Sequence, residues 1–335
     1  MQNVVCQSDD HMISEVSSRI TLADRWDHLQ ARLGIRRNRH RVEPGLYTLG
    51  KPSSESPVFA SANYTLSFDA LRSALAGVDC YILVLDTKGI NVWCAAGKGT
   101  FGTDELVQRI EGTGLAEIVN HRKVIVPQLG APGIAAHEVK QRSGFRVEYG
   151  PVRARDLPAY LETGKADNEM RRVTFHLADR LVLVPVEIVH MLLPMLVIAG
   201  VFYLVGGWLG ALGTAVAIMA GVVLFPILLP WLPTANFSTK GFILGGLVAV
   251  PFILARLINA PDMETWQRTV WGLTHLLLIP SMTAFLTLNF TGSTSFTSRS
   301  GVRREIFTYF PAMAWMFGGG LVLSITMTIL GLFGI

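Results

Sequence analysis

The sequence comprises 335 residues, 50% of them hydrophobic, and carries a formal net charge of +4. The apolar residues are concentrated after Arg180, which argues against a single soluble domain of even composition. The short arginine cluster between Arg36 and Arg41 has too few members to indicate nucleic-acid binding, and a basic surface facing a membrane explains it more simply.

Residues 1–55 are polar and contain one amphipathic pattern, at residues 21–33. Thr21 is followed three residues later by Asp24, an arrangement that marks the start of a helix because each side chain can cap the backbone of the other residue. We expect the remainder of residues 1–55 to form an N-terminal arm.

Strand-like and helix-like runs alternate from Pro57 onward. Strands are predicted at residues 57–61, 81–86, 123–126 and 145–149, and helices at residues 67–76, 101–110, 134–142 and 156–162. Alternation at this spacing predicts a Rossmann-like α/β domain at residues 56–168, with a doubly wound parallel sheet and helices on both faces.

A basic linker at residues 169–180 precedes the apolar C-terminal half of the chain. Five apolar segments follow, at residues 181–205, 208–229, 241–258, 269–290 and 311–333. Each is long enough to cross ~30 Å of hydrocarbon at ~1.5 Å per residue, so residues 181–335 are predicted to form an all-α transmembrane bundle of five helices. Arg171 and Arg172 flank the first segment, which predicts a multi-pass protein of the cytoplasmic membrane with its α/β domain in the cytoplasm.

The segment NVWCAAGKGT, at residues 91–100, lies between a predicted strand and a predicted helix, where α/β proteins bind cofactors. Cys94 is at its centre, with Trp93 on one side and the small residues Ala95, Ala96 and Gly97 on the other. A flat, bulky group could approach this thiol closely, which indicates a ligand or a nucleophile. The ordinary alternative is a buried packing cysteine beside a tryptophan.

The run NVWCAAGKGTF resembles the cap helix of the HgcA family, the membrane-anchored corrinoid proteins of microbial mercury methylation. A related segment occurs in the corrinoid iron-sulfur protein of the acetyl-CoA pathway. The likeness extends through residues 58–72, 124–140 and 149–164, with departures at Ser61 and Thr65. The resemblance implies a cobalamin-type corrinoid in base-off form, with the Cys94 thiolate as axial ligand of its cobalt. It also implies a methyltransferase that passes the methyl group of methyl-Co(III) to Hg(II), forming methylmercury.

Histidine ligands for cobalt have little support in this sequence. The DxHxxG loop of many corrinoid proteins is missing, and its nearest approximation, Asp9 with His11 and Ser14, follows no predicted strand. His121 and His137 lie on the α/β domain, where surface or packing roles are expected. Cys94 is the better candidate, because a soft anionic donor enriches the cobalt–carbon bond in electrons and favours methyl release to a soft electrophile such as Hg(II).

Further cofactor contacts are expected from the segment around Cys94 and from the carboxyl ends of the strands. The glycines of GKGTFG match neither a GxGxxG nor a Walker loop, so we interpret Lys98 as a contact to a corrin propionamide or tail phosphate, or as a helix-terminal charge. The expected binding residues are Ser61, Asn63, Thr87, Asn91, Val92, Trp93, Cys94, Ala95, Ala96, Gly97, Lys98, Gln128 and Gly150.

The three cysteines, Cys6, Cys80 and Cys94, cannot supply the four thiolates of an iron-sulfur cluster. The resemblance therefore implies a separate small ferredoxin with two [4Fe-4S] clusters as electron donor, together with a methyl-folate-dependent methyl donor. A membrane transport or binding protein for corrinoid or metal is the alternative, and a methyl carrier of carbon fixation is a third. Glu187, His190 and His275 are ionisable groups within the apolar half, which marks them as functional candidates.

Overall fold

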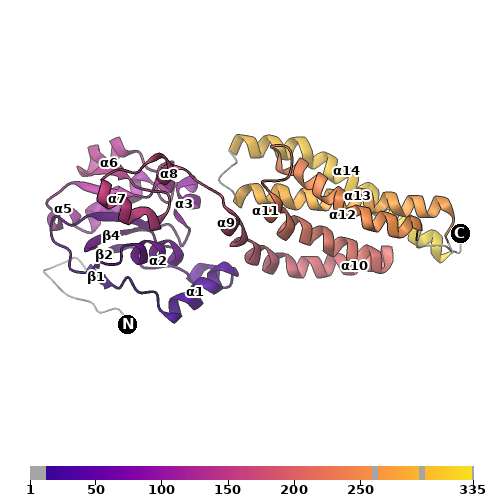
Figure 1. Ribbon diagram of the computed structural model, residues 1–335, viewed down its shortest axis with the longest axis horizontal. Coiled ribbons are helices and arrows are strands. Elements are labelled where there is room, and N and C mark those ends of the chain that lie inside the picture. The colour runs from indigo at the N-terminus through magenta and orange to yellow at the C-terminus, as the bar shows by residue number, and fades with distance from the viewer. Residues whose placement is uncertain (1–12, 259–262, 294–298, 334–335) are drawn as a thin grey trace. The chain divides into compact units, whose positions relative to one another are not determined.

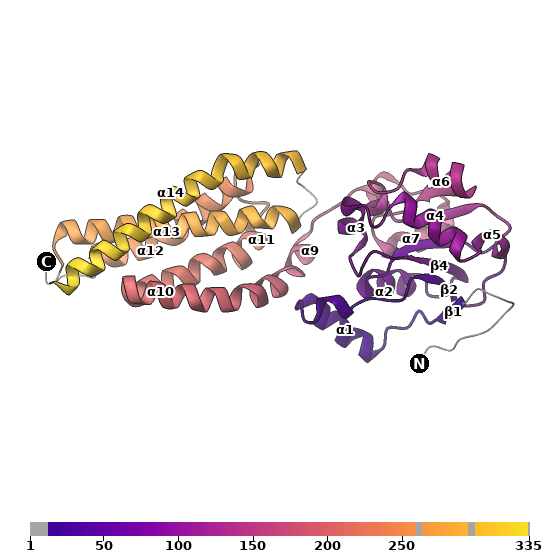
Figure 2. The same ribbon diagram turned by 180° about the vertical axis from the view of Figure 1, so that it is seen from behind.

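The computed structural model describes residues 13–258, 263–293 and 299–333. The chain divides into two compact units, residues 1–173 and residues 174–335 (Figure 1). The first unit contains a six-stranded sheet with the order β1-β2-β4-β3-β5-β6 (Figure 2). Its strands are β1 (Ile13–Val16), β2 (Gly45–Leu49), β3 (Val58–Ala62), β4 (Cys80–Leu85), β5 (Lys123–Val126) and β6 (Arg146–Tyr149).

The sheet is mostly parallel rather than wholly parallel as predicted. Strands β4, β3, β5 and β6 are parallel to one another, whereas β2 is antiparallel to β4 and carries β1 as its parallel neighbour. Both additional strands belong to the segment expected to be an arm. Both strands are short and show only a weak pattern of apolar residues. The position of β2 depends on its pairing with β4, which the local sequence does not indicate.

Helices cover both faces of the sheet, as predicted. On one face, α2 (Thr65–Ala74) and α7 (Leu157–Thr163) pack Phe68 and Tyr160 against Phe59 and Ile82. On the other face lie α4 (Thr103–Gly112), α5 (Leu115–Ile118) and α6 (Ala136–Ser143). Successive residues of β3 alternate between the two cores, because neighbouring side chains of a strand point to opposite faces.

The chain adds its next strands on opposite sides of β3. The crossover through α2 leads from β3 to β4 on one side, and the crossover through α4 and α5 then leads to β5 on the other side of β3. The carboxyl ends of β3 and β5 therefore flank a topological switch point, where open α/β sheets bind their ligands.

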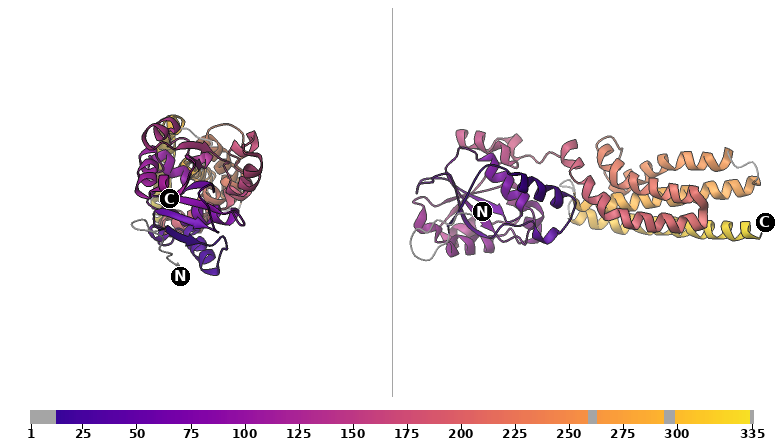
Figure 3. Two further views of the ribbon diagram at one scale, coloured as in Figure 1. Left: turned by 90° about the vertical axis from the view of Figure 1, so that its left-hand side faces the viewer. Right: turned by 90° about the horizontal axis from the view of Figure 1, so that it is seen from below.

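The second unit contains four helices long and apolar enough to cross a membrane among the described residues (Figure 3). They span Leu177–Leu228, Phe237–Ile258 (α12), Thr265–Asn289 (α13) and Ser300–Leu332 within α14 (Arg299–Leu332). The chain is thus a multi-pass membrane protein with four long apolar helices, and the prediction of five separate helices is corrected.

The difference from the prediction arises at Gly207. The first helical stretch contains α9 (Leu177–Leu181), α10 (Val184–Met219), a π-helical turn (Ala220–Leu224) and α11 (Phe225–Leu228). Gly207 interrupts α10 with a φ of 66° and a ψ of −162°. The stretch folds back at this glycine, so that its two ends meet. Arg180 at its start donates hydrogen bonds of 2.7 and 2.8 Å to the carbonyls of Pro226 and Ile227 at its end. The two segments predicted as separate helices are therefore two legs of one bent stretch.

Polar side chains of the bundle satisfy the carbonyl groups that this interruption releases. Arg256 donates a 2.8 Å hydrogen bond to the carbonyl of Gly206 and stacks on the ring of Trp271. Ser324 donates to the carbonyl of Val205 at 2.7 Å. His275 lies in the same bundle, with Nδ1 at 2.8 Å from the carbonyl of Trp271. These contacts give the intramembrane polar groups a structural use, since unpaired backbone groups are costly in hydrocarbon.

Candidate functional site

Cys94 lies in the first turn of a short helix, α3 (Val92–Lys98), that follows β4. Asn91 forms the N-cap, and its side-chain oxygen accepts a 2.9 Å hydrogen bond from the backbone N–H of Cys94. Gly99 ends the helix in a left-handed conformation, with φ at 83°, which glycine adopts at little cost. The cap holds the backbone of Cys94 in place while its thiol stays partly exposed.

The inner face of α3 rests on a close backbone approach. Ala95 and Ala96 are buried beneath the helix, and a Cβ at Gly133 would lie only 3.0 Å from the Cα of Ala96 and would overlap the carbonyl oxygen of Phe101. A side chain at residue 133 would therefore displace α3. Ala95 and Ala96 serve this packing against the loop, which places them under the helix instead of on an open face.

A cavity of about 410 Å³ lies between α3 and the carboxyl ends of the parallel strands. Asn91, Val92 and Trp93 line it from α3, and Ser61 and Gly150 line it from the ends of β3 and β6. Residues of β3 and β5 on either side of the switch point also line it, including Ala60, Ile125 and Pro127. The cavity thus occupies the place where ligands of this sheet type bind.

Five of the predicted contact residues line this cavity, namely Ser61, Asn91, Val92, Trp93 and Gly150. Cys94 itself does not line it but follows directly on the three α3 residues that do. Gly97 and Lys98 are exposed on the last turn of α3, away from the cavity lining.

Asn63 and Thr87 are occupied by hydrogen bonds within the sheet edge. The Asn63 side-chain oxygen accepts from the backbone N–H groups of Thr87 and Gly89 at 3.1 and 2.9 Å, and its amide donates to Asp86 at 3.1 Å. Both residues are buried. They fasten the ends of β3 and β4 together, and so position the segment that leads into α3.

Gln128 follows β5 in a short 3₁₀ turn, Gln128–Gly130, that packs against α3. Its side-chain oxygen is buried and has no hydrogen-bond partner within the part of the chain that the structure describes. A buried carbonyl oxygen without a partner is energetically costly. Gln128 lies beside the cavity, between the lining residues Pro127 and Leu129, but does not line it.

The two cysteines in the described residues differ in their surroundings. Cys80 is fully buried in β4, and burial, together with the nearby charge of Asp79, raises the pKa of its thiol to about 12. Cys94 is partly exposed. Cys6, Asp9 and His11 lie outside the described residues, and Ser14 is part of β1.

The predicted histidines have ordinary environments. His121 Nε2 lies 2.9 Å from the carbonyl of Ser56, and His137 is exposed on α6. Within residues 13–258, 263–293 and 299–333, no cluster of three or more His, Cys, Asp or Glu side chains could hold a metal ion.

Sequence reasoning missed several apolar residues of the cavity wall, including Phe59, Leu66 and Leu157, which no motif marks. Leu129, Pro151 and Val152 also line the cavity. They follow the strand ends, at residues 127–130 and 150–152, from which contacts were expected. The wall makes the cavity suitable for a largely apolar or amphipathic ligand.

Residues 34–161 match a protein family described as CO dehydrogenase/acetyl-CoA synthase delta subunit. The chain is also similar to the acetyl-CoA decarbonylase/synthase complex subunit gamma of several archaea. It is 34% identical to the Methanopyrus kandleri subunit over 128 residues, which is 38% of this chain and 27% of that protein. Identity to the Methanocaldococcus jannaschii subunit is 37% over 111 residues, covering 32% of this chain and 22% of that protein. The chain therefore spans about a quarter of the length of these curated relatives.

Proposed function

We propose that this chain binds a corrinoid in its α/β unit and transfers a methyl group from it to Hg(II), with the Cys94 thiolate as axial ligand of the cobalt. The position of Cys94 carries the proposal. It is a partly exposed thiol in a capped helical turn, adjacent to a cavity at the switch point of the sheet. The similarity to acetyl-CoA decarbonylase/synthase gamma subunits supports the cofactor class, since the segment around Cys94 also resembles one in the corrinoid iron-sulfur protein of the acetyl-CoA pathway.

The residues present fit such a group. The buried oxygen of Gln128 can accept a hydrogen bond from an amide N–H, and corrinoids carry several amide side chains. Trp93 and the apolar wall offer contacts to carbon-rich parts of the ligand. The cavity is smaller than a whole corrinoid, which suits it to a side chain or the nucleotide tail while Cys94 stays accessible from outside.

When bound, a corrinoid supplies a cobalt atom that can carry a methyl group. The thiolate of Cys94 is a soft, anionic donor, so it favours delivery of the methyl group as a carbanion equivalent to a soft acceptor. Asn91 orients this thiolate by fixing the first turn of α3. In other metal-binding proteins, residues that do not bind the metal hold the metal ligands in position, and Asn91 would act in the same way.

Two protein partners complete the proposal. With three cysteines, this chain cannot hold a [4Fe-4S] cluster, so a small ferredoxin with two such clusters would reduce the cobalt. A methyl-folate-dependent protein would supply the methyl group. The basic residues Arg171 and Arg172 before the first apolar helix favour a cytoplasmic location for the α/β unit, where these partners would meet it.

The comparisons favour one second candidate, a methyl carrier for acetyl-CoA synthesis, because the similar proteins are subunits of an acetyl-CoA decarbonylase/synthase complex. The cofactor and Cys94 would serve the same purpose in both cases. The two functions differ in the acceptor, so incubating the methylated protein with Hg(II) or with an acetyl-CoA synthase distinguishes them by product.

The decisive experiment replaces Cys94 by Ala and by His in the full-length protein, reconstituted with corrinoid and a chemical reductant. We expect Cys94→Ala to lose both the visible spectrum of thiolate-ligated cobalt and methylmercury formation. Cys94→His should retain corrinoid but methylate Hg(II) much more slowly, because imidazole is a neutral and weaker donor.

Cys80→Ala is the matched control, because it removes a thiol of the same unit that is buried and protonated. It should leave the cobalt spectrum unchanged. If Cys94→Ala kept the spectrum and methylation rate of the unaltered protein, the thiolate-ligand proposal would be wrong.

A further inference from the structure

Helix α1 (Leu22–Arg32) is attached to the α/β unit by its polar face. An amphipathic helix of a soluble domain normally turns its apolar face inward. In α1 no residue is buried, and Asp24, Asp27 and His28 form ion pairs with other parts of the unit. The orientation of this helix is therefore reversed.

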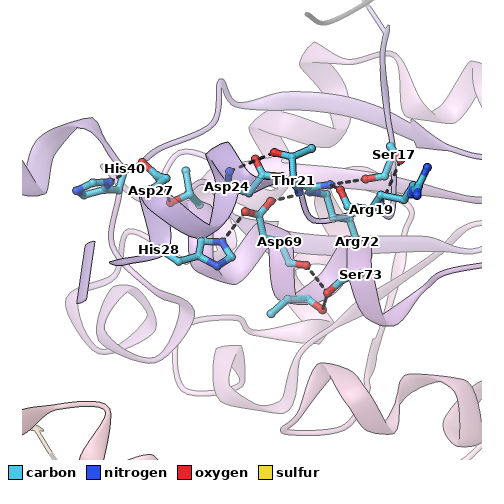
Figure 4. Close-up of polar contacts among 12 residues, drawn as sticks. Ser17, Arg19, Thr21, Asp24, Asp27, His28, His40, Asp69, Arg72 and Ser73 are labelled. Atoms are coloured by element: carbon cyan, nitrogen blue, oxygen red, sulfur yellow. Dashed lines mark hydrogen bonds and ion pairs between the residues drawn. The ribbon is translucent and has the colours of Figure 1, made fainter. Parts of the chain in front are cut away.

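A network of ion pairs and hydrogen bonds fixes this reversed orientation (Figure 4). Arg72 of α2 is at its centre and donates to Asp24 at 2.8 Å, to Asp69 at 2.6 Å and to the carbonyl of Arg19 at 2.8 Å. His28 Nε2 lies 2.7 Å from Asp69. Arg72 and Asp69 are nearly buried, so these pairs have defined partners and are shielded from water.

The second part of the network lies one turn further along α1. Asp27 accepts a 2.7 Å hydrogen bond from the hydroxyl of Thr65 and pairs with His40 at 2.7 Å. Both acidic side chains of α1 are thus turned toward the protein and paired there. The outward face of the helix is left without negative charge.

The outward face carries an apolar stripe with basic residues beside it. Leu22, Trp26 and Leu29 are spaced four and three residues apart, which places them on one side of the helix, and they are 82%, 62% and 47% exposed. Arg25 and Arg32 flank this stripe and are exposed, as is Arg36 beyond the helix end. An exposed apolar stripe with cations along one side and no acidic residue beside it is typical of a helix that lies in a membrane interface.

We infer that α1 is an interfacial helix, which inserts Leu22, Trp26 and Leu29 among the lipids of the membrane that this chain spans, with Arg25 and Arg32 on anionic headgroups. A lipid surface is favoured over a protein partner by charge complementarity and by the long apolar helices, which place a bilayer next to the chain in any case. The inference is independent of corrinoid binding.

The test uses the full-length protein in nanodiscs, with Cys6→Ser and Cys94→Ser so that only buried Cys80 remains. Leu29→Cys carries an NBD fluorophore, and His137→Cys on the exposed face of α6 provides the matched control. Bilayers contain either phosphatidylcholine alone or phosphatidylcholine with phosphatidylglycerol, and their chains are brominated at shallow or deep positions. We expect the label at residue 29 to lose most of its emission to shallow bromines in the anionic bilayer, since interfacial helices insert only ~5–10 Å.

The label at residue 137 should keep its emission throughout, and Arg25→Gln with Arg32→Gln should weaken the quenching at residue 29. A label at residue 29 that stays open to aqueous iodide and unquenched by bromines in both bilayers would overturn the inference. A label shielded from iodide but untouched by bromines would overturn it in favour of a protein partner. Equal quenching in both bilayers, unaffected by the arginine variants, would overturn the assignment to anionic lipid.

Discussion

Cys94 and Cys80 lie in the same unit but differ in exposure. Cys80 is enclosed by the core of the sheet, and the pKa of its thiol is raised to about 12 by burial and by the charge of Asp79. The neutral form is favoured there because thiolate ionisation is costly without water. Cys94, in the first turn of α3, is partly exposed.

We predict that a maleimide reagent at pH 8 modifies Cys94 and leaves Cys80 unmodified. Mass spectrometry of peptides checks this outcome, and Cys94→Ala is the control that should remove the labelled peptide containing residue 94. Raising the pH should not expose Cys80 while the unit stays folded. It should lower stability, since the unfolded-state thiol ionises above ~8.5 whereas the folded-state thiol ionises only near 12. Rapid labelling of Cys80 at pH 8 would contradict its burial.

Asn91 acts on the neighbouring backbone through its side chain, which caps α3. Replacing Asn91 by Ala removes the acceptor for the N–H of Cys94 and should cost ~1 kcal/mol of stability in the first turn. We expect Asn91→Ala to weaken corrinoid binding through a less ordered α3, and Asn91→Asp or Asn91→Ser to restore it, since each can cap. The measurement is corrinoid affinity by titration. Equal affinity for the Ala and Ser variants would show that the cap is unimportant.

The attachment of α1 to α2 depends on charge pairing instead of apolar packing. Two opposing effects act on the pKa of Asp24. Burial raises this pKa, but hydrogen bonds from Thr21 and Arg72 lower it by more, so the pKa is below its ordinary value. An acidic group with a lowered pKa contributes stability above ~3.9, and this contribution disappears as the pH falls through its folded-state pKa. The docking of α1 should therefore weaken in acid.

Arg72→Leu should release α1, because it removes the partner of Asp24 and leaves the nearly buried carboxylate of Asp69 with His28 alone. Breaking a buried pair costs about 3 to 5 kcal/mol, so we expect lower thermal stability and rapid proteolysis in residues 33–44. Arg142→Ala is the matched control, since it removes an exposed pair with Asp104 and should have no measurable effect. Equal protease resistance of the two variants would argue against the network as the attachment of α1.

Gly207 forms the bend in the first helical stretch of the membrane unit. Gly207 has a φ of 66° and a ψ of −162°, a region that residues with a side chain adopt at a cost of ~1–3 kcal/mol. Around it, Arg256 and Ser324 from two other helices satisfy the carbonyls of Gly206 and Val205. The bend therefore connects three of the four long helices.

We predict that Gly207→Val lowers the yield and thermal stability of the full-length protein in detergent, because the fold-back that pairs Arg180 with Pro226 is strained or lost. Gly200→Ala is the control. Gly200 lies in the same helix with open space around its Cα and ordinary backbone angles, so an added methyl group should be tolerated. Size-exclusion chromatography and a thermal shift assay compare the two variants. Similar stability for both would show that residue 207 does not need glycine.

The sequence alone was sufficient for features that depend on neighbouring residues. Strand-like apolar runs predicted β3 to β6 within a residue or two, and the Thr21–Asp24 capping box predicted the start of α1. The segment at residues 91–100 stays a predicted cofactor site, and Ser61 and Gly150, predicted as contacts because strand ends meet at one edge, line the cavity beside it. Hydropathy predicted long apolar helices in the second unit, since hydrocarbon thickness sets their length, but it divided the first helical stretch into two.

Only the tertiary structure decided features that depend on residues far apart in the chain. The antiparallel pairing of β2 with β4, the outward apolar stripe of α1 and the fold-back at Gly207 each rest on such contacts. Arg72 reaches Asp24 across 48 residues, and Arg180 reaches Pro226 across 46. The amphipathic pattern of α1 would by itself predict the opposite orientation. Long-range ion pairs and hydrogen bonds have no local sequence signature, because their free energy depends on burial and geometry that exist only once the chain has folded.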